Sequence, residues 1–547
     1  MKKHMRLFSV LLSAAMIVSL AAGCSRSSSQ ASGVPAESGG VSSGSGEPAM
    51  EGNMYLEGTP VVKEKETYTI AVSKHTLDKS ESYNDKIGIQ MVEEATNVHI
   101  EWIEVVSGTA DEKIPIMLAS DLPDAFLGLL NETYVSKNTG SFVVLNDLVS
   151  TYCPNIVEQY NAVEDMRDML KFPDGNIYTF ATDAQISPDN DGGPMFFMNT
   201  KWLSNVGMEM PATTDELYDV LKAFKEKDAN GNGDPGDEIP LETCENNWAA
   251  MIQYYSGPWG FIGNYKIENG KFIPAINTQA YRDFLEYFHK LAAEGLMDVE
   301  GFSQTNQQFY AKLKEYICGS YSGWTPQSNF DSETAKEYSM VMPLTAPGYE
   351  GQEIHTGYWQ EFRGNRTGFA VTTACKNPKV LLRWWDYMHS STELKWTLAY
   401  GEEGKIWERD GSGKVWTIYP ETEADYTREN MKYTEGMWTC EPLILAGEWE
   451  NNNGDEYPDS VLRYNMTVAC RDYYQTEILP KRFVAEEKTA ERALIETDLL
   501  SYLNTFRANS IINGVTDASW EEHLKQLEAL NLEGWVQWYQ DFIDGKF

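Results

Sequence analysis

Tyr68-Thr-Ile-Ala-Val72 is a short run of β-branched and aromatic residues, and the segments that follow it decide the fold class. The run itself has the composition of a strand. A stretch with helical spacing comes next at residues 85–96, and His99-Ile-Glu-Trp-Ile-Glu-Val105 is a second predicted strand. Strands that alternate with helices favour βαβ units and a mainly parallel sheet. We therefore expect an α/β fold.

The alternation continues along the chain. A predicted helix at residues 113–119 leads into the loop Asp121-Leu-Pro-Asp124, which enters another strand. In parallel sheets, ligands bind where loops gather at the carboxyl ends of strands. The later part of the chain is richer in helical spacing, which predicts helices at residues 213–227, 281–294, 305–315, 376–390, 477–506 and 519–530.

The length and net charge of the chain limit the number of domains and the kinds of partner that can be expected. The chain has 547 residues, too many for one typical domain core, so two or more lobes are expected. It carries 44 Lys and Arg against 82 Asp and Glu, a net charge of −38. So acidic a surface repels phosphate backbones and anionic headgroups, which argues against nucleic-acid binding.

The N-terminus is typical of an exported lipoprotein. Residues 2–6 are rich in basic side chains, and residues 7–20 form an apolar stretch too short to span a bilayer. Residues 1–23 are therefore predicted to be a signal peptide. The stretch ends Leu20-Ala-Ala-Gly-Cys24, which resembles the lipobox of bacterial lipoproteins, so we expect the Cys24 thiol to take the lipid, with palmitate among its chains. An ordinary signal peptide that contains a cysteine is the alternative.

Residues 24–65 are predicted to be a lipidated cysteine and a flexible tether. Ser, Gly, Ala and Glu dominate residues 25–53, a composition that buries too little apolar surface to offset the entropy of ordering. The cysteines beyond Cys24 are scattered and form no C-x-x-C pair, so neither a zinc site nor a dense disulfide framework is indicated. We expect mostly buried free thiols at Cys153, Cys244, Cys318, Cys375, Cys440 and Cys470.

The sharpest local motif is Asp228-Ala-Asn-Gly-Asn-Gly-Asp-Pro-Gly-Asp-Glu238. Calcium needs six to eight oxygen ligands from a tight loop, and the first, third and fifth positions here carry Asp or Asn. Gly233 stands at the sixth position, where an EF-hand loop turns sharply. Position twelve is Ile239 instead of the usual Glu, so we expect one structural calcium loop and not a paired sensor. A turn without an ion is the alternative.

The motif and its surroundings resemble family 1 extracellular solute-binding proteins, in particular their large lipoprotein branch of oligosaccharide and alginate-oligomer binders. The resemblance spans roughly residues 66–545. It rests on the ordered appearance of Asp121-Leu-Pro-Asp124, Asp174-Gly-Asn-Ile-Tyr178, Asn199-Thr-Lys-Trp202, Pro211-x-Thr213-x-Asp215-Glu216-Leu217, Asp237-Glu-Ile-Pro-Leu241, Cys375-Lys-Asn-Pro378, Trp384-Trp-Asp386-Tyr387, Tyr400-Gly-Glu-Glu-Gly404 and Trp520 through Leu532.

The resemblance implies two α/β lobes joined by crossing hinge segments, with a ligand cleft between the lobes. Residues 66–185 plus about 367–440 would form the N-terminal lobe, and residues 186–366 plus about 441–547 the C-terminal lobe. It implies a monomer, anchored by lipid to the extracellular face of the cell membrane, that delivers its cargo to the permease of an ABC importer and catalyses no reaction. The calcium ligands would be Asp228, Asn230, Asn232, Asp234, Asp237 and Glu238.

The predicted cargo is an oligosaccharide, because sugar binders stack aromatic rings on sugar faces and aim polar groups at the edges. The chain has 16 Trp and 30 Tyr. Trp324 is the first candidate, since Gly323 and Pro326 place it in a loop. The candidate ligand-binding residues are Trp324, Trp259, Trp359, Trp248, Tyr254, Glu361, Arg363, Trp438 and Asp124. For each aromatic residue, packing in the core is the alternative.

The same observations are compatible with two other functions. A secreted carbohydrate-active enzyme would need two carboxylates across a cleft, and nothing in the sequence singles out such a pair. An extracellular sensor of the same fold would bind cargo without transporting it. Peptides and other solutes also remain open as cargo.

Overall fold

The computed structural model describes residues 49–163, 165–182, 185–186, 193–234, 236–358, 364–409, 415–417, 428–445 and 458–547. By its internal contacts, Pro48–Phe547 forms one compact unit. The predicted signal peptide, Cys24 and tether residues 25–48 lie outside the described residues. The prediction of a flexible tether is wrong for residues 49–65, because Met54, Val61 and Val62 are buried in the core of the first lobe. No described helix is both long enough and apolar enough to cross a membrane.

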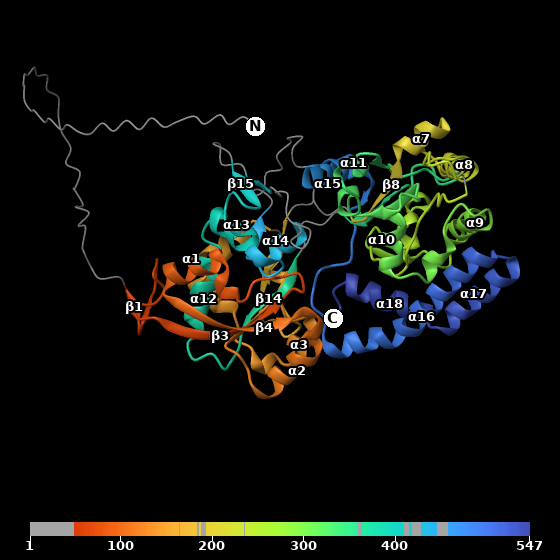
Figure 1. Ribbon diagram of the computed structural model, residues 1–547. Coiled ribbons are helices and arrows are strands. Elements are labelled where there is room, and N and C mark those ends of the chain that lie inside the picture. The colour runs from red at the N-terminus through yellow and green to blue at the C-terminus, as the bar shows by residue number, and fades with distance from the viewer. Residues whose placement is uncertain are drawn as a thin grey trace, which may run out of the picture. The chain divides into compact units, whose positions relative to one another are not determined.

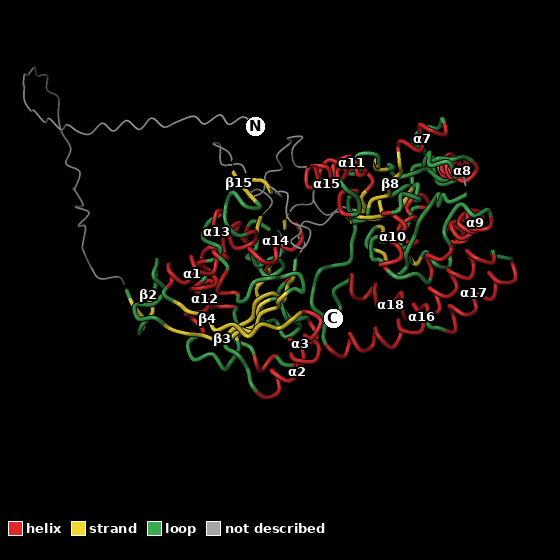
Figure 2. Tube along the Cα trace, in the orientation of Figure 1, coloured by secondary structure: helices red, strands yellow, loops and turns green. Residues whose placement is uncertain are grey.

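The first sheet contains the strands predicted from the opening segment (Figure 2). Its order is β4 (Val98–Val106), β3 (Glu66–Lys74), β5 (Ala125–Leu127), β14 (Asn365–Val371) and β6 (Phe180–Thr182). Strands β4, β3 and β5 run parallel, with Tyr68 opposite Ile100. Strand β14 runs antiparallel to β5 and to β6, so the predicted parallel arrangement holds only for the βαβ units at one side of the sheet.

Helices pack on this sheet around the first core. The side chains of Trp384 and Trp385 are fully buried there, on the helix predicted at residues 376–390, and Phe369 of β14 stacks on Trp385 with 4.5 Å between ring centroids. The helices of this lobe are α1 (Ile87–Thr96), α2 (Ala110–Ser120), α3 (Glu132–Lys137), α4 (Asn146–Tyr152), α5 (Pro154–Asn161), α6 (Met166–Met169), α12 (Pro378–Tyr387), α13 (Thr392–Tyr400) and α14 (Arg428–Glu435) (Figure 1).

The second lobe has its own sheet and core. Strand β8 (Met195–Asn199) lies between β11 (Ser320–Gly323) and β12 (Tyr338–Met340), and both neighbours are antiparallel to it. The expectation of parallel strands is therefore wrong for this lobe. Its helices are α7 (Thr200–Val206), α8 (Thr214–Glu226), α9 (Gln279–Ala293), α10 (Asn306–Lys314), α11 (Ser332–Ala335), α15 (Pro458–Ala469), α16 (Glu486–Asn513), α17 (Asp517–Ala529) and α18 (Leu532–Ile543).

Local sequence explains where several of these helices begin. Thr213 caps α8: its hydroxyl accepts a bond from the Glu216 N–H at 3.1 Å, and the Glu216 carboxylate accepts one from the Thr213 N–H at 3.2 Å. Helix α16 starts at Glu486, later than the predicted 477, because the chain before it holds strand β18 (Tyr474–Gln475) and Pro480.

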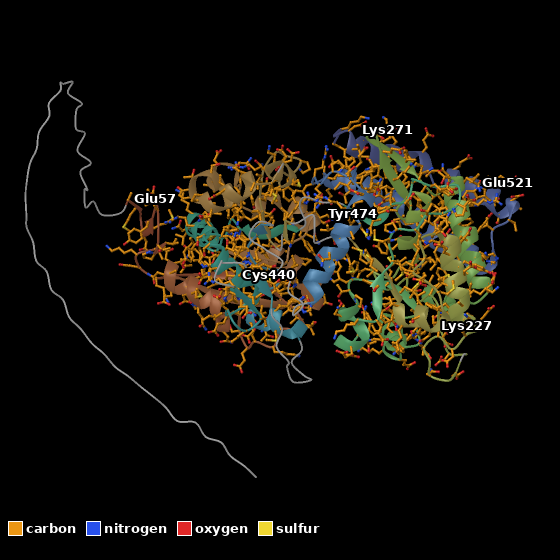
Figure 3. All side chains as sticks on the ribbon, turned by 90° about the horizontal axis from the view of Figure 1, so that it is seen from above. Glu57, Lys227, Lys271, Cys440, Tyr474 and Glu521 are labelled. Carbon is orange, nitrogen blue, oxygen red and sulfur yellow. The ribbon has the colours of Figure 1, made fainter. Side chains whose placement is uncertain are left out.

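The chain crosses between the two lobes through paired short strands. Strand β7 (Gln185–Ile186) runs parallel to β17 (Ile444–Leu445). Strand β13 (His355–Tyr358) runs parallel to β18, and Tyr474 of β18, labelled in Figure 3, lies 4.7 Å from His355 between ring centroids. These pairs are the crossing segments of a two-lobe fold.

One contact of the last segment differs from the predicted lobe assignment. Phe483, placed by prediction in the C-terminal lobe, packs in a core cluster with Phe126 and Ala370 of the first sheet. Its ring stacks on Phe172 at 4.1 Å, and the Arg366 guanidinium lies 4.2 Å above it. The chain between β18 and α16 therefore also contacts the first lobe.

The remaining described strands form two-stranded ribbons: β1 (Met50–Glu51) with β2 (Met54–Tyr55), β9 (Tyr265–Glu268) with β10 (Lys271–Pro274), and β15 (Trp407–Arg409) with β16 (Val415–Thr417). All cysteines beyond Cys24 are buried free thiols, as predicted.

Candidate ligand-binding site and metal loop

The structure brings two of the predicted cargo residues together. Trp248 and Trp324 lie 6.1 Å apart between ring centroids, with an angle of 52° between their planes. Trp248 is 57% exposed, which is unusual for so large an apolar side chain, and Trp324 is half-buried. An exposed aromatic pair of this kind offers flat apolar surface to a ligand.

Hydrogen bonds fix the loop that carries Trp248. The Asn247 side chain accepts a bond from the Ala249 N–H at 3.0 Å and donates one to the Tyr310 hydroxyl at 3.1 Å. The Glu245 carboxylate accepts the Ile252 N–H at 2.7 Å. The buried Arg507 guanidinium lies 3.7 Å from that carboxylate. Trp248 is thus exposed on a loop whose ends are held to the core.

Trp259 and Tyr254 lie elsewhere. Trp259 is only 5% exposed and packs against Phe284 and Phe288, so core packing, the alternative for each aromatic residue, accounts for it. Both residues line a cavity of about 60 Å³, together with Phe196 and Tyr255. That space is large enough for a few water molecules.

A second aromatic group lies in the first lobe. Trp438 lies 5.1 Å from Tyr400 between centroids, with the Lys432 ammonium 4.9 Å above its ring. The His75 and Tyr433 rings stack at 3.8 Å. His75 directly follows β3, so it stands at the carboxyl end of a central parallel strand, where ligands bind in such sheets. His75 and Tyr433 were not predicted; that rule, applied to the strand 68–72, points to His75.

Asp124 stands at the amino end of β5. Its carboxylate accepts hydrogen bonds from the Thr69 N–H at 2.8 Å and from the Thr69 hydroxyl at 3.0 Å. These bonds link the start of β5 to β3, so the described contacts of Asp124 stabilise the sheet. The other predicted cargo residues, Trp359, Glu361 and Arg363, lie outside the described residues.

The predicted calcium loop is closed by its own hydrogen bonds. The Asp228 carboxylate accepts the Gly233 N–H at 3.0 Å, and Gly233 has a φ of +94°, a conformation that favours glycine. The side-chain amides of Asn230 and Asn232 donate to the two Asp237 oxygens at 3.1 and 2.7 Å. The loop therefore already has the compact turn that an EF-hand-type site requires.

Two oxygens of the loop have no partner among the described residues. Asp228 Oδ1 and Glu238 Oε2 are buried and unbonded, although Glu238 Oε1 accepts the Ala229 N–H at 2.9 Å. Burial raises the pKa of Glu238 above its usual value. Within the described chain, no three His, Cys, Asp or Glu side chains lie close enough together to hold a metal. The loop's donors are carboxylate and amide oxygens, the ligand type that calcium prefers.

A buried acid lies beneath the loop that carries Trp248. Glu242 is fully buried, and its carboxylate accepts a bond from Gln304, which also donates to the Thr243 carbonyl at 2.6 Å. Burial first, and then the negative charge of Asp298, raise the Glu242 pKa to about 8, against the lowering effect of Lys312. This acid is largely protonated at neutral pH.

The chain is similar to known proteins in sequence and in fold. No protein-family model matches it. It is 26% identical over 533 residues to FusA, a fructooligosaccharide ABC transporter substrate-binding protein of Streptococcus pneumoniae. The alignment covers 92% of this chain and 94% of FusA. The structure of FusA in complex with kestose superposes with a TM-score of 0.73 over 88% of this chain and 99% of that chain, at 24% identity. Along most of its length the chain is similar in sequence to an ABC transporter substrate-binding protein, and it has the same fold.

Two further proteins resemble the chain, one in fold and one over a short stretch of sequence. An extracellular solute-binding protein from Bifidobacterium longum subsp. infantis superposes with a TM-score of 0.75 at 21% identity, over 88% of this chain and 98% of that one. Lipoprotein LipO of Bacillus subtilis is 42% identical over 107 residues, which are 18% of this chain and 20% of LipO. FusA has also been solved as an EF-hand mutant with fructo-nystose, at a TM-score of 0.73 and 23% identity over 88% of this chain and 99% of that one. The resemblance predicted from sequence is confirmed, since FusA is an ABC transporter substrate-binding protein.

Proposed function

We propose that this solute-binding protein captures an oligosaccharide outside the cell and delivers it to the permease of an ABC importer. The observation that carries the proposal is its similarity to FusA along 92% of the chain, in sequence and in fold. The exposed Trp248 beside Trp324 supports a sugar as cargo, because an aromatic platform matches the apolar face of a sugar ring.

Two groups of residues are proposed to contact the cargo. In the second lobe these are Trp248 and Trp324, and in the first lobe Trp438 with the His75–Tyr433 stack. Both groups join aromatic faces to polar atoms, the combination that sugar binders use. Trp359, Glu361 and Arg363 remain proposed contacts on the strength of their sequence alone.

A thermal-shift titration tests the proposal. The soluble chain from Ser25 to Phe547 is heated with kestose, longer fructooligosaccharides and oligosaccharides of other sugars, with calcium present. A concentration-dependent rise in melting temperature with one sugar class supports the proposal, because ligand that binds only the folded state stabilises it. No rise with any saccharide, together with a rise for peptides, would reject a sugar cargo.

The same samples separate binding from catalysis. We propose that the protein is not an enzyme, because its relatives are binding proteins and because no carboxylate pair is singled out. Chromatography of a saccharide that binds, after long incubation, should return it unchanged. Shortened products that appear in proportion to protein concentration would favour the carbohydrate-active enzyme instead.

We also propose that the loop Asp228–Glu238 binds one structural calcium ion. Its support is the pair of buried, unbonded oxygens, Asp228 Oδ1 and Glu238 Oε2, and the EF-hand spacing of the remaining oxygen donors. FusA, which aligns over most of its length, has an EF-hand. Asn230, Asn232, Asp234 and Asp237 would complete the ligand set.

Lipid attachment at Cys24 is the last part of the proposal. It rests on the lipobox-like Leu20-Ala-Ala-Gly-Cys24. Cells that express the wild-type chain should incorporate labelled palmitate into it and retain it in the membrane fraction, whereas C24S should release it. Equal membrane retention of both would reject the anchor. Light scattering of the released protein should give the mass of a monomer.

A further inference from the structure

Arg463 lies beneath one of the proposed cargo-binding rings. It belongs to α15, and its side chain is only 1% exposed. The guanidinium carbon lies 3.9 Å from the centroid of the Trp324 ring. One guanidinium nitrogen donates to the Trp324 carbonyl at 3.2 Å, and the other donates to the carbonyl of Gly193. A single side chain thus holds both the ring and the backbone of Trp324.

The chemistry of arginine suits this arrangement. A guanidinium is planar, so it can lie flat on an indole while its N–H groups point outward in the same plane toward carbonyl oxygens. A cation on an aromatic face contributes more when both are removed from water, and Arg463 is buried. Lysine keeps the charge but has neither the flat face nor the fork, so it cannot make the same three contacts.

The second carbonyl, that of Gly193, connects Trp324 to the start of β8. Gly193 lies just before β8, the strand that pairs with β11, and β11 leads directly into Trp324. Along the chain, β7 precedes Gly193 and β17 precedes α15, and β7 pairs with β17. The Arg463 guanidinium therefore joins Trp324, which follows β11, to Gly193, which precedes β8.

We propose that Arg463 is a positioning residue for cargo binding: it fixes the Trp324 ring and joins it to the backbone at Gly193, just before β8. The proposal rests on the proposed function of Trp324. Because the guanidinium covers one face of the indole, cargo can stack only on the opposite face. Arg463 acts through Trp324 and does not itself contact cargo.

Fluorine NMR of protein labelled with fluorotryptophan tests the positioning without any ligand. W324F identifies the Trp324 resonance. In R463K and in R463Q this resonance should shift and broaden, because the ring loses its stacked partner and samples other rotamers. The matched control is R492K, since Arg492 lies 5.2 Å from the Trp538 ring centroid: it should move the Trp538 resonance and leave that of Trp324 unchanged. An unmoved Trp324 resonance in whichever Arg463 variants fold overturns the proposal.

Calorimetry with kestose tests the consequence for binding. R463K should weaken binding by about five- to tenfold, and it should weaken it no further in a W324A background, because residues that act as a unit are not additive. Equal weakening in both backgrounds, or unchanged affinity despite a shifted resonance, would overturn the proposal. Wild-type protein that binds neither kestose nor another saccharide would reject the proposed cargo, and the Trp324 resonance alone would then decide whether Arg463 orients the ring.

Discussion

At the scale of single residues, the exposed Trp248 beside the half-buried Trp324 makes the first prediction. Trp324→Ala should weaken cargo binding by about tenfold or more, since a buried aromatic contact is a typical hot spot of an interface. The fold should persist, because Trp324 is half-buried and lies outside the main core clusters. Calorimetry with the sugar that raises the melting temperature measures the loss. Trp535→Phe, a change in the core, is the control: it should lower stability and leave affinity unchanged. Full affinity in W324A would remove Trp324 from the site.

Glu242 supplies a second prediction at this scale, on pH. Burial raises its pKa from 4.5 to about 8, so the folded state holds a proton that the unfolded state has lost within that window. Stability should therefore fall as pH rises from about 4.5 to about 8, by a few kcal/mol in all. Glu242→Gln keeps an acceptor for Gln304 and should flatten this fall in melting temperature. E300Q, at an exposed neighbour of Lys312, should keep the wild-type slope. A slope that survives in E242Q would contradict the assignment.

At the scale of elements, the loop Asp228–Glu238 predicts a response to chelators. Removing calcium should lower the melting temperature by several degrees, because an ion at about a hundred times its Kd stabilises the folded state by about 2.7 kcal/mol. Asp228→Asn and Glu238→Gln should each abolish the difference between calcium and chelator. Asp331→Asn makes the same change of charge at the N-cap of α11, where Asp331 accepts two backbone N–H bonds, and it should leave the chelator effect intact. The same melting temperature with and without calcium in the wild type would reject the metal site.

The elements also show how far sequence could predict this structure. The start of α8 depends on two residues three positions apart, Thr213 and Glu216, so it could be predicted from local sequence. Strands β3 and β4 could be predicted from their composition. The antiparallel partners of β8 come from distant segments, and no local pattern encodes that pairing. The His75–Tyr433 stack has the same origin. Tryptophan composition alone could not separate the buried Trp259 from the exposed Trp248, because burial depends on tertiary packing.

At the scale of the whole molecule, two separate cores and few connections favour hinge motion. Each lobe has its own sheet and apolar cluster. The described crossings are short: β7 with β17, and β13 with β18, at two to four residues each. Such segments can bend while the packed cores move as rigid bodies, since close-packed cores deform little. Phe483 adds a fixed point, because its stack with Phe172 and Arg366 anchors the chain before α16 to the first lobe.

The hinge arrangement predicts that the two lobes close when cargo binds. Small-angle scattering of the soluble chain should show a smaller radius of gyration when the bound sugar is saturating, because cargo that contacts both lobes favours the closed arrangement. W324A at the same sugar concentration should keep the larger radius, and it should close only when the concentration is raised to match its weaker affinity. Calcium alone should leave the radius unchanged, since its proposed loop lies within one lobe. Saturating binding by calorimetry with no change in radius would mean that cargo occupies one lobe, and that His75, Tyr433 and Trp438 do not contact it.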